Sequence, residues 1–278
     1  MIKLGCYGVI QDQDSEGGFL EIERFVRFAY DLRLDVVDFH LGKGFISHDL
    51  DYLRHIKLLC LKLGLPIGYL GSGGGFVGTE EELRAKIAKA KADVDIAVTL
   101  GAPMIRLMGG RPSDDDPNPE ATWSDTIQSF QEVADYAASK AISLGVQNHG
   151  PPARPRGPDI LRILRDTGRD NVTHIMDTGQ WWPDFGTGMG GDFQPNEAIY
   201  DYMEQVVSNA GYVRAKIYKI DGGREEYLDY GRVLKLLNEA GYNGVLSIVY
   251  EGQRYSDCDD FEAVRLATSY LREMLAAS

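Results

Sequence analysis

Two carboxylates in this sequence stand directly after short apolar runs. Asp177 closes the run that begins at Val172, and Glu251 follows the run Leu246–Tyr250. A carboxylate at the end of a buried strand has to be solvated, paired or bound to a metal ion, because burying it alone costs several kcal/mol. We therefore predict that Asp177 and Glu251 take part in a functional site. The alternative is that each is solvated and caps the loop after its strand.

Two basic residues interrupt a third apolar run. In Val213-Arg214-Ala215-Lys216-Ile217, Arg214 and Lys216 alternate with apolar neighbours, so both side chains point to the same face of a strand. Charges on a buried face are costly without anionic partners. One interpretation is an ion-paired interior, and the other is contact with an anionic substrate or with an enolate that forms during a reaction. The sequence leaves both open.

Polar residues at other expected strand ends complete the candidate site. His149 is a candidate general acid or base because histidine titrates near neutrality, although a loop histidine held by hydrogen bonds is the alternative. Trp181 and Trp182 follow Asp177 closely, where aromatic rings suit stacking on a sugar face, although loop packing explains them equally. The predicted substrate-binding residues are Gln147, His40, Arg106, Trp181 and Gln180. The predicted catalytic residues are Glu251, Asp177, Lys216, Arg214 and His149.

The elements that position these residues alternate along the chain. Short apolar runs, typical of strands buried on both faces, are separated by longer amphipathic stretches, typical of helices. The predicted strands are Ile2–Gly8, Asp35–His40, Pro66–Leu70, Met104–Met108, Val146–Asn148, Val172–Asp177, Tyr212–Tyr218 and Gly244–Tyr250. The predicted helices are Phe19–Leu32, Asp49–Leu63, Thr79–Leu100, Thr122–Leu144, Pro158–Asp166, Asn196–Ala210, Tyr230–Ala240 and Asp260–Ala276.

Local signals mark the ends of these helices. Thr79 with Glu82 forms a capping-box pattern at the start of the third helix. A Gly just past a helix adopts the left-handed conformation without a steric clash, so it is a natural helix stop. We predict such stops at Gly64, Gly101, Gly145, Gly168, Gly211 and Gly241.

Eight strands that alternate with eight helices predict parallel βαβ units that close into a barrel. The predicted fold is α/β, a single (β/α)8 TIM barrel over residues 1–278. A doubly wound open sheet is the main alternative, but Gly8–Gln11 lacks the Gly-rich phosphate-binding pattern that follows the first strand of that fold. Barrel active sites lie at the C-terminal ends of the strands, so we expect the candidate residues to meet at that mouth.

Composition limits the classes of function. Apolar residues make up 44% of the 278 residues, and the net charge is −13. That charge disfavours a nucleic-acid partner, whose phosphates require clustered Lys and Arg. No run reaches the roughly 18 apolar residues of a membrane span, and Cys6, Cys60 and Cys258 are too widely spaced for a disulfide frame or a thiolate zinc site. We expect a cytoplasmic protein that acts on a small molecule; association into a homo-oligomer is left open.

On these residues the sequence resembles the xylose isomerase-like sugar epimerase and isomerase superfamily. The matching segments are Leu144–Gly150, Met176–Gln180, Val213–Tyr218 and Ile248–Gly252. The resemblance implies a (β/α)8 barrel in which Glu, Asp, His and Glu on the last four strands bind one divalent metal ion. It also implies that the two Glu residues shuttle a proton beside a ketose carbonyl. Similar barrels include dehydratases and an endonuclease branch with three zinc ions, which the five histidines and the acidic charge disfavour.

Two metal-ligand positions depart from that pattern. Gln147 stands where the resemblance implies Glu, and Arg214 stands where it implies His, whereas Asp177 and Glu251 remain. An amide and a cation are poor ligands for Mg²⁺ or Mn²⁺. The resemblance therefore implies at most one weakly held divalent ion (Mn, Mg or Zn) on Asp177, Glu251 and Gln147, and otherwise no cofactor. Our hypothesis is instead that the Arg214 guanidinium occupies the region of the metal and bridges Asp177 and Glu251.

The expected function is that of an isomerase or epimerase acting on a sugar, cyclitol or related polyhydroxy carbonyl compound. Glu251 is the expected base that abstracts a proton beside the carbonyl, with His149 as a second acid or base and with Lys216 or Arg214 polarising the oxygen. Two alternatives remain. One is a barrel that binds a sugar without catalysis or forms a subunit of a larger enzyme, and the other is a lyase or dehydratase of the same superfamily.

Overall fold

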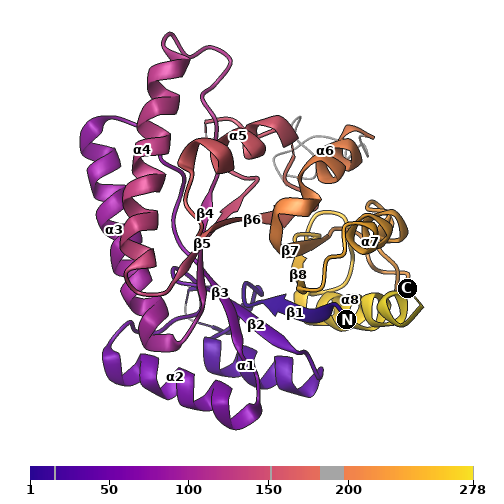
Figure 1. Ribbon diagram of the computed structural model, residues 1–278. Coiled ribbons are helices and arrows are strands. Elements are labelled where there is room, and N and C mark those ends of the chain that lie inside the picture. Colours follow the sequence, from indigo (N-terminus) through magenta and orange to yellow (C-terminus); the bar gives the residue numbers. More distant parts are fainter. Residues whose placement is uncertain (16, 151, 182–196, 278) are drawn as a thin grey trace.

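The computed structural model describes residues 1–15, 17–150, 152–181 and 197–277. Along these residues eight strands and eight α-helices alternate, and the strands pair in parallel in chain order. The sheet closes where β1 (Lys3–Tyr7) pairs with β8 (Val245–Tyr250), and the helices surround it (Figure 1). The predicted (β/α)8 barrel is therefore confirmed. Within the described ranges no helix is both long enough and apolar enough to cross a bilayer.

The elements keep the predicted order. The remaining strands are β2 (Val36–His40), β3 (Ile67–Gly71), β4 (Met104–Met108), β5 (Ser143–Gln147), β6 (Val172–Asp177) and β7 (Ala210–Ile217). The helices are α1 (Ile22–Asp31), α2 (Leu50–Leu63), α3 (Glu80–Leu100), α4 (Pro119–Ala138), α5 (Gly157–Thr167), α6 (Ala198–Val206), α7 (Tyr230–Glu239) and α8 (Asp260–Ala277), with a 3-10 turn at Val207–Asn209.

The helix signals hold at most of the predicted places. At the start of α3 the Thr79 backbone N–H donates to the Glu82 carboxylate at 2.8 Å, and the Glu82 N–H donates to the Thr79 hydroxyl, as a capping box requires. Four of the predicted glycine stops have positive φ just after a helix, namely Gly64, Gly101, Gly168 and Gly241.

The other two predicted glycine stops are wrong. Helix α4 ends at Ala138 instead of Leu144, and the turn after it contains Ala141 at φ 58°, so a non-glycine residue takes the left-handed conformation there. Gly145 lies inside β5, where an added Cβ would stand 2.3 Å from the Ile175 side chain. Gly211 similarly lies inside β7, so Ala210 belongs to that strand and not to the helix predicted to end there. Asn196, the predicted start of that helix, is outside the described residues.

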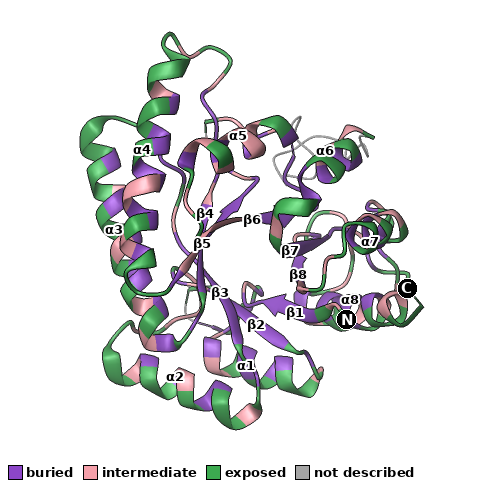
Figure 2. Cartoon of the chain, in the orientation of Figure 1, coloured by how far each residue is buried: buried purple, intermediate pink, exposed green. Residues whose placement is uncertain are grey.

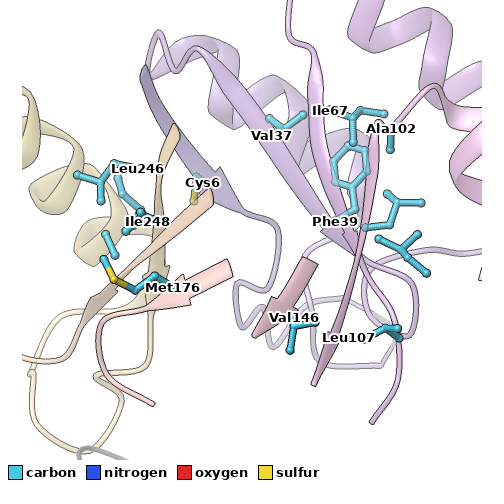
Figure 3. Packing of buried hydrophobic residues seen from close by; sticks show 14 of the residues in the cluster. Cys6, Val37, Phe39, Ile67, Ala102, Leu107, Val146, Met176, Leu246 and Ile248 are labelled. Carbon is cyan, nitrogen blue, oxygen red and sulfur yellow. The ribbon is translucent and has the colours of Figure 1, made fainter. Parts of the chain in front are cut away.

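Apolar side chains fill the layer between the strands and the helices. Figure 3 shows part of this layer around Phe39, Ile67 and Val146. The strands are buried along most of their length, whereas the helices are exposed on their outer faces (Figure 2). This layer holds the strand ends in fixed positions around the mouth of the barrel.

A second layer fills the barrel interior below the mouth. The rings of Tyr7, Tyr69 and Tyr212 come from β1, β3 and β7, which are not neighbours in the sheet, yet their centroids lie 5.6 Å (Tyr7–Tyr69) and 5.1 Å (Tyr69–Tyr212) apart. Asp38 of β2 accepts hydrogen bonds from the Tyr212 hydroxyl at 2.7 Å and from the Ser247 hydroxyl at 2.5 Å. Burial raises the pKa of Asp38 to about 7. The interior is therefore packed below the mouth, and the cavity that concerns the candidate site lies at its C-terminal end.

Candidate active site

A cavity of about 160 Å³ lies at the C-terminal ends of the strands. Most of the predicted site residues line it together, namely His40, Arg106, Gln147, His149, Arg214, Lys216 and Glu251. All of these residues lie at or near the C-terminal end of a strand. This is the face at which the active sites of (β/α)8 barrels lie.

Asp177 lies behind this lining and is fully buried. The register of β6 and β7 makes Arg214 its partner across the sheet, and the Arg214 Nε donates to Asp177 Oδ2 at 2.9 Å. Gln147 Nε2 donates to the same oxygen at 2.7 Å, the Gly179 N–H donates to Oδ1 at 3.0 Å, and Lys216 Nζ lies 3.7 Å from Oδ2. Burial raises the pKa of Asp177, but Lys216 and Arg214 outweigh it, so the net pKa is lowered. Asp177 is therefore a permanent buried anion at neutral pH.

Lys216 connects this buried anion to the mouth. Its ammonium group is 1% exposed and donates to Glu251 Oε1, while the Glu251 side chain is 39% exposed. Gln180 Nε2 donates to the other Glu251 oxygen at 3.1 Å. Glu251 is thus the carboxylate of the pair that a ligand can reach, held in place by one cation and one amide.

The hypothesis that Arg214 bridges the two carboxylates is half wrong. Arg214 does pair with Asp177, but it then turns back into the barrel, donates to the Tyr69 hydroxyl and lies 4.3 Å from the centroid of the Tyr7 ring. Lys216 stands two residues closer to the end of β7 and is the cation that lies between Asp177 and Glu251. Arginine stacks on aromatic rings readily, so the tyrosine layer holds the guanidinium away from Glu251.

The amide of Gln147 connects the anion Asp177 to the cation Arg106. Its Oε1 accepts from Arg106 Nη1 at 2.9 Å, while its Nε2 donates to Asp177. Both partners fix the same orientation of the amide, because only its oxygen accepts and only its nitrogen donates. Arg106 is 4% exposed, and a Cβ on Gly71 would lie 2.9 Å from its Nη2, so a glycine in β3 makes room for it.

The two mouth histidines do not have ordinary pKa values. Burial lowers the pKa of His149 to about 3, assisted by the positive charge of Lys216, and burial with Arg106 and Lys43 lowers the pKa of His40 to about 3. Both imidazoles are therefore neutral at physiological pH. The titration near neutrality on which the role of His149 was predicted is not found, although its neutral ring still lines the cavity.

Trp181 packs in the protein interior, which was the alternative to the predicted stacking on a sugar. It is fully buried, and its ring lies 6.1 Å from His174 and 5.8 Å from Tyr202, measured between centroids. It is not part of the cavity lining described here. Within the part of the chain that the structure describes, Gln180 is joined to the cavity lining by its hydrogen bond to Glu251. Trp182 lies outside the described residues.

Six residues that line the cavity were not predicted from the sequence, namely Tyr7, Val9, Lys43, Met108, Val249 and Tyr250. Lys43 lies in the loop three residues beyond His40, and its ammonium group is 4.4 Å from the centroid of the Phe19 ring. Tyr7 is the last residue of β1 and looked like an ordinary strand aromatic. Extending the strand-end search a few residues into each loop would have found Lys43, whereas no local signal distinguishes Tyr7.

The residues at the mouth do not fit a divalent metal ion. The two carboxylates that remain are already joined by Lys216, and the other two expected ligand positions hold an amide and a guanidinium. Among the described residues no three His, Cys, Asp or Glu side chains are grouped for metal binding. The predicted ligand set of Asp177, Glu251 and Gln147 is therefore replaced by an ion-pair network.

Solved structures of several proteins share this fold. A xylose isomerase domain protein from Planctomyces limnophilus is 17% identical, with a TM-score of 0.69 over 99% of this chain and 96% of that chain. D-psicose 3-epimerase from Clostridium cellulolyticum H10 is 14% identical, with a TM-score of 0.74 over 98% of each chain. An AP endonuclease of family 2 from Brucella melitensis is 17% identical, with a TM-score of 0.69 over 97% of this chain and 99% of that chain. At these identities the likeness concerns the fold alone.

No curated protein matches the sequence. The family profile described as xylose isomerase-like TIM barrel matches residues 21–274, which is most of the chain. The chain therefore belongs to the xylose isomerase-like TIM barrel family.

Proposed function

We propose that this barrel is an isomerase or epimerase that abstracts a proton beside the carbonyl of a small polyhydroxy compound. One observation carries the proposal: the partly exposed carboxylate Glu251 is held against the buried ammonium of Lys216 at the mouth. A carboxylate is a suitable general base for a carbon acid, and a buried cation beside it is a suitable stabiliser of the enolate. The structural likeness to D-psicose 3-epimerase is consistent with this chemistry.

The charges of the pair suit the reaction. Glu251 takes the proton, the electrons of the C–H bond form the C=C bond of an enediolate, and the negative charge moves to the former carbonyl oxygen. Lys216 then loses an anionic partner in Glu251 and gains one in that oxygen, so the net charge beside the ammonium stays constant. Return of the proton to the former carbonyl carbon, together with transfer of the hydroxyl proton from the neighbouring oxygen to the former carbonyl oxygen, gives an isomer. Return of a proton to the opposite face of the original carbon gives an epimer.

Two other groups assist in this scheme. Asp177 holds the Lys216 ammonium in position from below, at 3.7 Å. His149, as a neutral imidazole in the cavity lining, is the candidate for hydrogen bonding to a substrate hydroxyl or for carrying a proton on the second face.

The test is deuterium exchange. A panel of ketoses is incubated with the protein in D₂O, and NMR follows the carbon beside the carbonyl. Wild type is expected to catalyse exchange at one position, and Glu251→Gln to lose it by about 10²–10⁴-fold, the range for loss of a general base. Glu226→Gln is the matched control, because Glu226 is exposed and pairs with Lys219 away from the cavity.

The outcomes separate the alternative functions. Exchange that survives in Glu251→Gln contradicts the assignment of the base. Exchange accompanied by loss of water from the substrate indicates a lyase. Sugar binding without exchange indicates a barrel that binds and does not catalyse, and it overturns the proposal.

A further inference from the structure

The cavity lining carries more positive than negative charge. Arg214 is neutralised by Asp177 at 2.9 Å and Lys216 by Glu251. Lys43 and Arg106 also line the cavity, and neither forms an ion pair with a carboxylate of the described chain. This excess stands out in a protein whose net charge is −13.

Arg106 is the more informative of the two cations. It is 4% exposed, and its hydrogen bonds go only to neutral acceptors: Gln147 Oε1 at 2.9 Å, the Tyr7 hydroxyl at 3.3 Å and the Ser72 carbonyl at 3.4 Å. Its Nε has no hydrogen-bond partner within the part of the chain that the structure describes. A buried cation without a counter-charge is strongly unfavourable, so the fold holds Arg106 in a state that an anion would improve.

The neighbouring side chains respond to the same positive potential. Arg106 and Lys43 both contribute to lowering the pKa of His40, and Lys216 and Arg106 contribute to lowering that of His149. Burial is the main reason that the pKa of Lys43 is lowered, and Arg106 and Lys216 add to this effect while Glu251 opposes it. The neutral rings of His40 and His149 can form hydrogen bonds with hydroxyl groups. The positive charges of Lys43 and Arg106 remain available to an anion.

We infer that the ligand of this cavity carries a carboxylate, which docks between Arg106 and Lys43 while its polyhydroxy part extends toward Glu251 and Lys216. The second half of this statement rests on the proposed function, and the first half does not. An Arg with a free Nε offers the fork geometry that suits a planar carboxylate.

Binding of three probes with one carbon chain tests this inference. Ribitol, ribonate and ribitol phosphate differ only at the end of the chain, where they carry a hydroxymethyl group, a carboxylate or a phosphate. Isothermal titration calorimetry is expected to show ribonate binding at least about tenfold more tightly than ribitol, which corresponds to about 1.4 kcal/mol. Equal affinities for ribonate and ribitol overturn the inference. A tenfold preference for ribitol phosphate over ribonate overturns the choice of carboxylate.

Two variants locate the effect. Arg106→Gln is expected to abolish the preference for ribonate over ribitol. Arg111→Gln is the matched control, because Arg111 is also buried but pairs with Asp114 outside the cavity, and its preference should match that of wild type. Loss of the preference in Arg111→Gln, or its survival in Arg106→Gln, contradicts the assignment.

If Arg106→Gln does not fold, the dependence of ribonate binding on ionic strength in wild type provides a second test. In wild type, the affinity for ribonate is expected to fall as ionic strength rises, while that for ribitol stays constant. A ribonate affinity that does not respond to salt overturns the inference. None of these probes has the aldehyde or ketone carbonyl that the proposed reaction needs, so binding is measured independently of turnover. A ribonate preference together with an absence of deuterium exchange on any ketose, with or without a terminal carboxylate, would refute the proposed function and leave the anion site standing.

Discussion

Replacing Lys216 by Met removes the one ammonium group that lies between Asp177 and Glu251. Met has a similar length and apolar stem, so the change deletes a charge more than a volume. Asp177 would keep Arg214 at 2.9 Å and the amide of Gln147 at 2.7 Å, whereas the one side-chain hydrogen bond left to Glu251 among the described residues would be that from the amide of Gln180. The variant should therefore fold but lose the group that receives the enolate charge.

The magnitudes follow from these distances. At 3.7 Å and an effective dielectric constant of about 20, the attraction between Lys216 Nζ and Asp177 Oδ2 is about 4 kcal/mol. Removing the ammonium also removes its own desolvation cost, which is several kcal/mol, and Arg214 still neutralises Asp177. We therefore expect the free energy of unfolding to fall by about 1–2 kcal/mol. The exchange rate should fall by about 10²–10³-fold, as for loss of an oxyanion-stabilising donor.

Asp177→Asn is the comparison that exposes the role of charge. That change leaves Lys216 with Glu251 as its ion-pair partner and leaves Arg214 without a carboxylate at ion-pair distance among the described residues, so we expect a loss of about 3–5 kcal/mol. Lys219→Met is the control, because the Lys219–Glu226 pair is at the surface and 3.9 Å apart, and such pairs contribute about 0–1 kcal/mol. Urea unfolding at neutral pH measures all three variants, and deuterium exchange measures the activity of those that fold.

The order in which the three variants lose stability tests the roles assigned to Asp177 and Lys216. The expected loss of stability is greatest in Asp177→Asn, smaller in Lys216→Met and smallest in Lys219→Met. If Asp177→Asn were no less stable than Lys216→Met, the view of Asp177 as the anion that holds two cations would be refuted. If Lys216→Met kept the wild-type exchange rate, Lys216 would have no part in the reaction.

Three further outcomes are expected. Treatment with a chelator leaves the exchange rate unchanged, and elemental analysis finds well under one divalent ion per chain; activity lost to the chelator and restored by Mn²⁺ would contradict the ion-pair network. The pKa of His149 is about 3 in the folded state and about 6.5 when unfolded, so the stability it contributes is complete above about pH 6.5 and is lost as the pH falls toward 3. His149→Gln should therefore flatten the acid limb of stability, measured by urea unfolding, by up to about 1 kcal/mol per pH unit; an unchanged slope would show that the ring is solvated. Gly179→Ala places a Cβ 2.8 Å from Lys216 Cγ and should lower the exchange rate, whereas Gly74→Ala, with no atom within 4 Å, should leave it unaltered.

The fold could be predicted because its repeat is local. Each strand is buried on both faces and each helix on one, so apolar runs and amphipathic stretches alternate visibly along the chain. The errors arose where a local signal had a tertiary cause. Gly145 and Gly211 are glycines because β5 and β7 pack closely against Ile175 and Thr173, which no feature of the neighbouring sequence reveals. Ala141 adopts a positive φ although it is not one of the residue types, such as Gly or Asn, that commonly do so.

The sequence could predict which residues belong to the site, but it could not predict which of them form ion pairs with each other. The strand-end rule found the carboxylates and the basic residues of β7, because their positions follow from the barrel. Which cation reaches Glu251 depends on side-chain reach and on the tyrosine rings that hold Arg214, and these belong to distant strands. The pKa of His149 likewise depends on burial and on charges from other elements.

The amide of Gln147 limits how this barrel can change by single substitutions. A Glu at this position would set a second carboxylate about as close to Asp177 as the amide nitrogen now is, at 2.7 Å, where a donor is required. A His at position 214 would remove one of the two cations that keep Asp177 ionised. Both changes are unfavourable while Lys216 fills the space between the carboxylates. A change of this chain to a metal-binding set at positions 147 and 214 would therefore require several substitutions to occur together, because the internal cations make each single step unfavourable.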